Sequence, residues 1–286
     1  MNKITSGWIN GFIGMLIFSA SLPATRIAVS DFSPLFLTSI RGTIAAILAL
    51  FFLFIFREKR PVRDDFSSLI IVAFGVVIGF PLLTSLALQY ITSAQSLIYI
   101  GLLPLSTAVF GVLRGAERPR WTFWFFSVLG SSLVVVYALS QGFDTSLIGN
   151  ACMLGAIIVC GLGYAEGAKL SRRLGGWQVI SWALVLALPL MMGLSIYTVP
   201  ETFDTVSRSA WAGLVYVSLF SMFIGFIFWY RGLAQGGIAA VGQLQLLQPF
   251  FGLMLAASLL DEKVELAMIL VTIGVITSVV ASKRFA

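Results

Sequence analysis

Ten apolar stretches, each long enough to cross a lipid bilayer, constrain this chain more than any other feature. A helix rises about 1.5 Å per residue and the hydrocarbon core of a bilayer is about 30 Å thick, so one crossing needs about 20 apolar residues. Such stretches take up most of the 286 residues. We therefore expect an all-α integral membrane protein without a soluble domain. The predicted spans cover residues 8–25, 34–56, 67–89, 92–113, 121–140, 147–168, 177–198, 210–230, 237–259 and 264–281.

The basic residues between these spans predict the orientation of the protein. Lys and Arg collect in the short loops that stay on the cytoplasmic side. With ten spans, 14 of the 18 Lys and Arg residues fall on one side and 3 on the other, while Arg41 lies inside a span. We therefore expect both termini to be cytoplasmic. The same effect explains the net charge of +6 without a nucleic-acid partner. The 14 are Lys3, Arg57, Lys59, Arg60, Arg63, Arg114, Arg118, Arg120, Lys169, Arg172, Arg173, Arg231, Lys283 and Arg284.

A weak internal repeat relates the two halves of the chain. At one offset of 145 residues, the fourth and ninth spans and the segments after them share Ala94 and Ala239, Leu102 and Leu247, Pro104 and Pro249, and Glu117 and Glu262. Each half then holds five spans, and an odd number reverses the direction of the second half. Inverted repeats of this kind are common in secondary transporters. We expect residues 1–143 to form one five-helix repeat and residues 144–286 the other.

The sequence lacks the side chains of an enzyme. It contains no His, and no two carboxylates share the interior of a span, so general-base and metal chemistry have no obvious carrier. We expect no catalytic residue, no metal and no cofactor. Pairs of glycines four residues apart, at Gly75/Gly79, Gly163/Gly167 and Gly232/Gly236, indicate closely packed helices instead.

Polar side chains inside the spans are the candidates for a substrate site, because lipid would penalise them. Gln95 and Tyr99 share one face of the fourth span, and Gln245 and Gln248 share a face of the ninth. The repeat places these faces opposite each other, which favours a wet cavity between the halves. Hydrogen bonds that fix neighbouring helices are the alternative.

Aromatic residues and one arginine extend this prediction. Phe80 and Trp182 lie deep in their spans and, with Tyr99 and Tyr164, are candidates to line the cavity around an apolar side chain. Arg41 lies about seven residues into the second span, where it faces an anion, extends toward the interface or forms a structural bond with backbone carbonyls. All three interpretations remain open at this stage.

Two prolines fall in the middle of predicted spans. Pro104 and Pro249 each remove a backbone donor and clash with the preceding turn, which kinks a helix. One interpretation is a hinge for alternating access. The other is a static kink that shapes the bundle.

Several short motifs resemble the EamA-type repeat of the drug/metabolite transporter superfamily. The second half repeats them more weakly, at Ala168-Lys169 and Asp261-Glu262-Lys263, and has Leu184 near the position that corresponds to Arg41. The motifs are Thr25-Arg26-Ile27-Ala28, Pro34, Arg41, Gly115-Ala116-Glu117-Arg118-Pro119 and Trp121. The resemblance covers essentially the whole chain and is greatest to the bacterial amino-acid exporters of the aromatic (YddG-like) group.

This resemblance implies a multi-pass transporter of the bacterial inner membrane, with ten helices in two inverted halves around a central cavity. Its substrate would be an amino acid, aromatic or large and apolar, or a similar small metabolite. No acid lies near the middle of any predicted span, whereas proton-driven antiporters usually hold one there. We therefore expect facilitated transport or exchange. A multidrug carrier, a nucleotide-sugar carrier and a channel remain as alternatives, and the sequence does not decide the oligomeric state.

Overall fold

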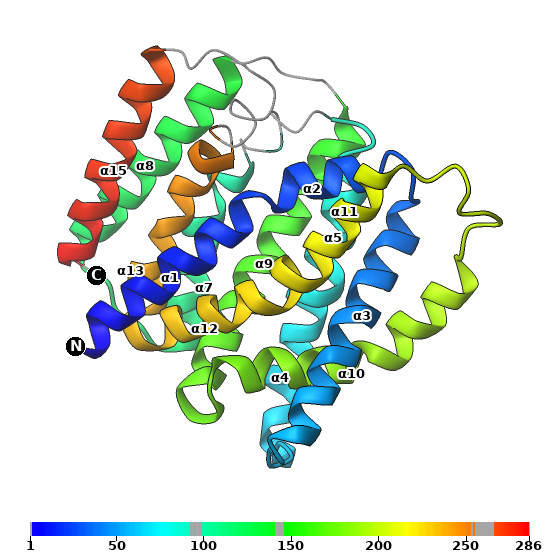
Figure 1. Ribbon diagram of the computed structural model, residues 1–286. Coiled ribbons are helices and arrows are strands. Elements are labelled where there is room, and N and C mark those ends of the chain that lie inside the picture. Colours follow the sequence, from blue (N-terminus) through cyan, green and yellow to red (C-terminus); the bar gives the residue numbers. More distant parts are fainter. Residues whose placement is uncertain are drawn as a thin grey trace.

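Helices account for nearly all of the fold in the computed structural model, which describes residues 2–91, 96, 99–140, 146–252, 254 and 266–285 (Figure 1). No strand occurs within these ranges. Six helical stretches among them are long and apolar enough to cross a membrane, and two shorter apolar helices accompany them. The expectation of an all-α membrane protein is confirmed.

The described residues of the first half include helices in each of the five predicted spans, with several local departures from a regular helix, and the fourth span is described only in part. The first span is bent where its two helices meet at Ala20, and the third passes through a π-helical segment. The elements are α1 (Lys3–Ser19), α2 (Ser21–Ala28), α3 (Pro34–Ile55), η1 (Arg63–Asp65), α4 (Phe66–Val72), η2 (Ala73–Gly79), α5 (Phe80–Ala87), α7 (Leu103–Gly115) and α8 (Trp121–Ser140).

The second half follows the same order. Its third span contains a π-helical segment, and its fourth changes from an α-helix to a 3₁₀-helix. The elements are α9 (Leu147–Leu174), α10 (Gly176–Tyr197), α11 (Arg208–Tyr216), η3 (Val217–Ile224), α12 (Gly225–Gly236), α13 (Ile238–Gly242), η4 (Gln243–Leu247) and α15 (Leu266–Phe285).

Serine residues start three of the long helices. The side chains of Ser33, Ser146 and Ser207 accept hydrogen bonds from the backbone N–H groups of the first turns of α3, α9 and α11. These N–H groups have no partner within the helix, so the serine oxygens satisfy them. Ser207 also donates to Asp31 across the loop end of the bundle, at 2.6 Å, which lowers the pKa of the Asp31 carboxyl.

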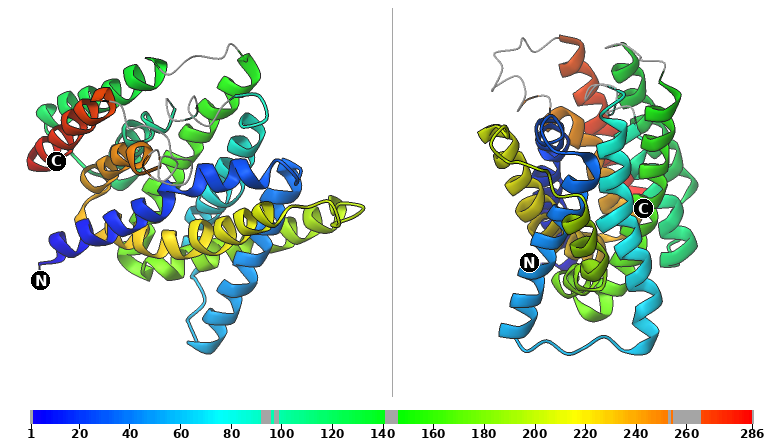
Figure 2. Two further views of the ribbon diagram at one scale, coloured as in Figure 1. Left: turned by 45° about the horizontal axis from the view of Figure 1, so that its top comes forward. Right: turned by 90° about the vertical axis from the view of Figure 1, so that its right-hand side faces the viewer.

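The two halves do not form separate lobes but pack against each other along their length. In Figures 1 and 2, α1 lies beside α12, α3 beside α10, and α8 beside α15, and these are extensive contacts. The α1–α12 pair joins the first span of one half to the third span of the other. The reverse pair, α9 with η2 and α5, is also in contact. The first and second halves are therefore joined by several long helix pairs.

Both described chain ends lie at the same end of the bundle (Figure 1). The Lys283 ammonium near the C-terminus lies 4.5 Å from the ring centre of Trp8 near the N-terminus. An even number of crossings is needed to bring the ends together in this way, as the alternation of charge predicts.

The π-helical segments occupy corresponding places in the two halves. In η2, the N–H of Phe80 bonds the carbonyl of Gly75, and in η3 the N–H of Gly225 bonds that of Phe220. Both bonds span five residues instead of four. Pro81 lies two residues after the end of η2, and a proline ring displaces the preceding turn. A Cβ on Gly79 or Gly225 would lie only 2.6 Å or 2.9 Å from the carbonyl oxygen five residues earlier, so both segments need glycine there.

Glycines bring α1 and α12 into direct backbone contact. A Cβ added to Gly232 would lie 2.5 Å from the backbone nitrogen of Gly11 and 2.7 Å from its Cα. Gly75 and Gly163 meet similarly, since a Cβ on Gly75 would lie 3.0 Å from the Cα of Gly163. The prediction that these glycine pairs mark close helix packing is confirmed.

Replacement of Gly232 by alanine tests this contact. Because the added methyl group meets backbone atoms that cannot rotate away, we expect G232A to destabilise the protein by about 1–3 kcal/mol. The matched control is G193A, because a Cβ at Gly193 meets nothing within 4 Å. Thermal unfolding in detergent should show a lower Tm for G232A and an unchanged or slightly higher Tm for G193A. Equal Tm values for the two variants would contradict the assignment.

Candidate functional site

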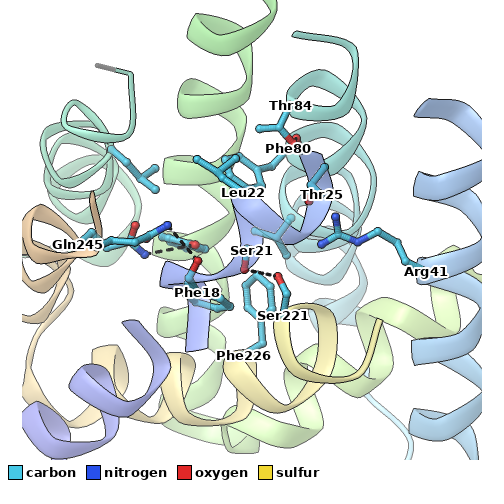
Figure 3. A pocket seen from close by; sticks show the side chains of 14 residues that line it. Phe18, Ser21, Leu22, Thr25, Arg41, Phe80, Thr84, Ser221, Phe226 and Gln245 are labelled. Carbon is cyan, nitrogen blue, oxygen red and sulfur yellow. Dashed lines mark hydrogen bonds between the residues drawn. The ribbon is translucent and has the colours of Figure 1, made fainter. Parts of the chain in front are cut away.

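A cavity lies in the middle of the bundle, where the two halves meet. Side chains from both halves line it, and Figure 3 shows them converging from several helices. The lining residues are Phe18, Ser21, Leu22, Thr25, Arg41, Val76, Phe80, Thr84, Leu103, Tyr164, Ser221, Phe226, Gln245 and Gln248.

The cavity is small in this conformation. The space free for the centres of water molecules is about 30 Å³, whereas a single water needs about 10–15 Å³. Two or three waters would fill the cavity. A solute as large as an amino acid therefore requires the helices to move apart, and the structure represents a closed state.

Irregular backbone surrounds this cavity. The bend at Ala20 separates the lining residues Phe18 and Ser21. The π-helical segments η2 and η3 supply Val76 and Ser221, and the 3₁₀-helix η4 supplies Gln245. In a membrane, non-helical backbone is tolerated where it lines a cavity or is buried in protein.

Among the described residues, Arg41 supplies the only charge of the lining. Its side chain extends from α3 into the cavity, toward Thr25 and opposite Gln245 (Figure 3). The residue is 4% exposed, and its buried Nε has no hydrogen-bond partner among the described residues. None of the ion pairs in the described part of the chain includes Arg41. A buried cation without a counter-charge is costly, which makes Arg41 a candidate binding residue.

Two glutamines form the opposite wall. The Gln245 amide donates to the Tyr164 hydroxyl at 3.3 Å, and the Gln248 amide donates to the Phe18 carbonyl at 3.2 Å. The side-chain carbonyl of Gln245 is buried without a partner in the described residues. It is therefore available as an acceptor for a donor group in the cavity.

Aromatic rings complete the lining. Phe18 packs against Tyr164 and Phe226, with ring centres 6.5 Å and 5.0 Å away, and Phe80 lies on the side of Thr84 (Figure 3). These rings offer an apolar surface, and the hydroxyl of Ser21 donates to Ser221 at 2.8 Å beside it. The cavity thus combines one cation, several hydroxyl and amide groups, and a wall of rings.

Ion pairs close the end of the bundle that carries the basic residues. Glu166, whose side chain is fully buried, accepts from Arg114 at 2.7 Å and from Ser68 at 2.6 Å. Lys169, three residues after Glu166, also pairs with it at 3.4 Å, and this is the longer of the two ion pairs.

A second carboxylate joins the two halves directly at this end. Glu117, in the segment after α7, accepts from the N–H groups of Ile238 and Ala239, both at 2.7 Å, at the start of α13. It also pairs with Arg172 of α9 at 2.8 Å. One side chain of the first half thereby holds two helices of the second half.

Comparison with known proteins identifies the family. The EamA-like transporter family matches residues 5–138 and 147–282. The chain belongs to this family. It is 66% identical over 286 residues, 100% of both chains, to the uncharacterized transporter YdeK of Bacillus subtilis (strain 168). It is 23% identical over 255 residues, 87% of both chains, to an uncharacterized transporter of Archaeoglobus fulgidus. A solved crystal structure has the same fold, with a TM-score of 0.79 at 17% identity, over 97% of this chain and 96% of the other.

Five of the residues predicted for the site meet in the cavity of this EamA-like transporter, namely Arg41, Phe80, Tyr164, Gln245 and Gln248. Tyr99 lies four residues before the start of α7. It is half-buried beside the core and does not line the cavity. Trp182 lies in grooves near Arg57 and Arg60 at the basic end, because its face of α10 is turned toward the end of α3. Gln95 lies outside the described residues.

The two prolines proposed as hinges occupy unlike positions. Pro104 lies in the first turn of α7, where its missing N–H needs no partner within the helix. Pro249 follows η4 and cannot donate to the Gln245 carbonyl, which accepts instead from the N–H of Gln248 in the tighter 3₁₀ pattern. The hinge assignment of either proline stays a prediction.

The sequence analysis missed the hydroxyl residues of the site. Ser21, Thr25, Thr84 and Ser221 line the cavity, but single Ser and Thr residues are common in membrane helices and bond their own backbone. Thr84 does so, since its hydroxyl donates to the Phe80 carbonyl at 2.7 Å. The small-residue run at positions 19–21, which includes Ser21 and lies near Thr25, was a signal for the bend beside these hydroxyls.

Removal of the Glu117 carboxylate tests the contact between the halves. Because E117A leaves two N–H groups and Arg172 without their acceptor, we expect a loss of about 1–3 kcal/mol of stability. The matched control is E201A, since Glu201 lies exposed in the connection between α10 and α11. A drop in Tm for E201A as large as that for E117A would refute a specific role for Glu117.

Proposed function

We propose that this EamA-like transporter carries amino acids with aromatic or large apolar side chains across the membrane by alternating access, as an exporter in the cell. The observation that supports this proposal most strongly is the buried Arg41, without a counter-charge among the described residues, in a central cavity with aromatic walls. Arg is well suited to a carboxylate, because its planar guanidinium can donate two parallel hydrogen bonds.

The remaining groups of an amino acid have partners in the same cavity. The free side-chain carbonyl of Gln245 can accept from the ammonium group. The rings of Phe18, Phe80 and Phe226 offer a surface for an apolar side chain. Tyr99 and Trp182, which the sequence suggests, would reach such a substrate only after a conformational change, and Gln95 remains a candidate outside the described residues.

We further propose that transport is facilitated or proceeds by exchange, without proton coupling. No carboxylate of the described residues lines the cavity. Glu166 is engaged at the basic end with Arg114 and Lys169, and a proton carrier in the substrate path would need a titratable group there.

The arrangement of the repeats and the location of the protein are part of this proposal. The two ranges that match the family, 5–138 and 147–282, support a division into residues 1–143 and 144–286. The basic residues support cytoplasmic termini in a bacterial inner membrane. The substrate and the lipid bilayer are the partners that the fold requires.

Uptake of labelled amino acids into proteoliposomes, with and without a pH gradient, tests the function. We expect saturable uptake of aromatic and large apolar amino acids that only equilibrates, whatever the pH gradient. Uphill accumulation driven by pH alone would exclude the uncoupled mechanism. A lack of uptake for every amino acid would exclude the substrate class, and cationic drugs and nucleotide sugars would be the next panel.

Variants of the lining test the role of each group. R41Q removes the charge but keeps a polar side chain, so we expect KM to rise at least about tenfold, as the loss of a charge-assisted hydrogen bond predicts. Q248A should lower transport and leave the amount of protein in the membrane unchanged. R231Q is the matched control, because Arg231 is exposed on α12, away from the cavity. Wild-type kinetics of R41Q would remove Arg41 from the site.

A further inference from the structure

The Arg41 guanidinium places a positive charge in the cavity, and no described acidic side chain neutralises it when no substrate is bound. The described acidic residues are Asp31, Glu58, Asp64, Asp65, Glu117, Glu166, Glu201 and Asp204, and none of them lines the cavity. Three are already engaged, since Glu166, Glu117 and Asp65 pair with Arg114, Arg172 and Arg173 at the basic end. The protein therefore supplies no counter-charge to Arg41 within the described ranges.

Arg41 is also largely shielded from bulk water by the described residues. The residue is 4% exposed, and its side chain points inward from α3 rather than along the helix toward the interface (Figure 3). An isolated buried charge costs several kcal/mol after relaxation. An anion that accompanies Arg41 through the closed state would remove this cost.

The geometry of the cavity fits a small anion. The space for water-sized particles is about 30 Å³, enough for one halide ion with a water but not for an amino acid. Two hydroxyl groups can join the guanidinium as donors. Thr25 faces Arg41 (Figure 3), and the Ser221 hydroxyl accepts from Ser21, so its own proton remains available.

We propose that Arg41, Thr25 and Ser221 form a binding site for a small monovalent anion, such as chloride, which occupies the cavity when no substrate is present. When the substrate binds, its carboxylate displaces this anion, a step that rests on the proposed function. The charge of the cavity then stays balanced in both the empty and the loaded transporter.

Chloride-dependent thermal stability of the purified full-length protein tests the site. The Tm is measured against sodium chloride concentration, with sodium gluconate to keep the ionic strength constant, because gluconate is too large for the cavity. Binding to the native state alone stabilises it, so we expect a saturable rise of about 3 °C in the wild type. The control R231Q should show the same rise, and R41Q should show none.

Two further variants keep the test valid if R41Q fails to fold. R41K retains the charge and should retain a saturable rise, whereas T25V removes one donor and should increase the half-saturating chloride concentration several-fold. A wild-type Tm that does not depend on chloride, or a rise that is unchanged in both R41Q and T25V, would overturn the proposal.

Acetate tests whether a carboxylate takes the place of the anion. As a small carboxylate, it should also raise the Tm and should reduce the further effect of added chloride.

The chloride and uptake measurements together separate the anion site from the proposed function. A chloride effect without any amino-acid uptake would leave the anion site standing and exclude the proposed substrate. Amino-acid uptake without a chloride effect would support the proposed substrate and exclude the anion site.

Discussion

Inside a bilayer, every backbone N–H and C=O group must find a partner within the protein, and this requirement explains both the regular and the irregular parts of the fold. Regular helices satisfy it alone, and the described chain is helical throughout its spans. The departures occur at Ala20, η2, η3 and η4, and each contributes a residue to the same cavity. Backbone that would be penalised in lipid is thus confined to the place where a polar solute would be bound.

The departures also provide side chains with directions that a regular helix would not give. The Phe18 carbonyl, next to the bend at Ala20, accepts from Gln248 of the other half. In the 3₁₀-helix η4, Gln243 and Gln245 diverge, since Gln243 donates to Ser127 of α8 while Gln245 donates to Tyr164. Irregular segments therefore determine which polar groups face the cavity and which fix neighbouring helices.

Much of this architecture could be predicted because hydropathy and charge act over whole segments. The spans, the paired glycines and the meeting of the chain ends all follow from such patterns. Arg41, Phe80, Gln245 and Gln248 were found as site candidates because charges, amides and rings are rare or conspicuous in membrane helices. These predictions depend on the composition of a helix face and tolerate errors of a residue or two.

The orientation of single side chains depends on rotations of a helix by a few tens of degrees, and the composition of a segment does not encode such rotations. Trp182 was expected in the cavity but lies in grooves at the basic end, because both orientations bury a large ring equally well. The π-helical segments shift the register of all later residues in their helices by one position. Pro81 was a visible signal for η2, yet η3 has no proline and depends on Gly225 alone.

The backbone contact between α1 and α12 has a consequence for biosynthesis. The glycine face of α1 is complete after the first 19 residues, but its partner begins at Gly225. At about 5–20 residues per second, the ribosome needs about 10–40 s to make the intervening chain. During this time α1 must stay in the bilayer without its partner, with a narrow, polar backbone groove exposed to lipid. Slow translation of the second half would prolong that exposure, so the order of synthesis sets a period in which the nascent chain is open to incorrect helix pairing.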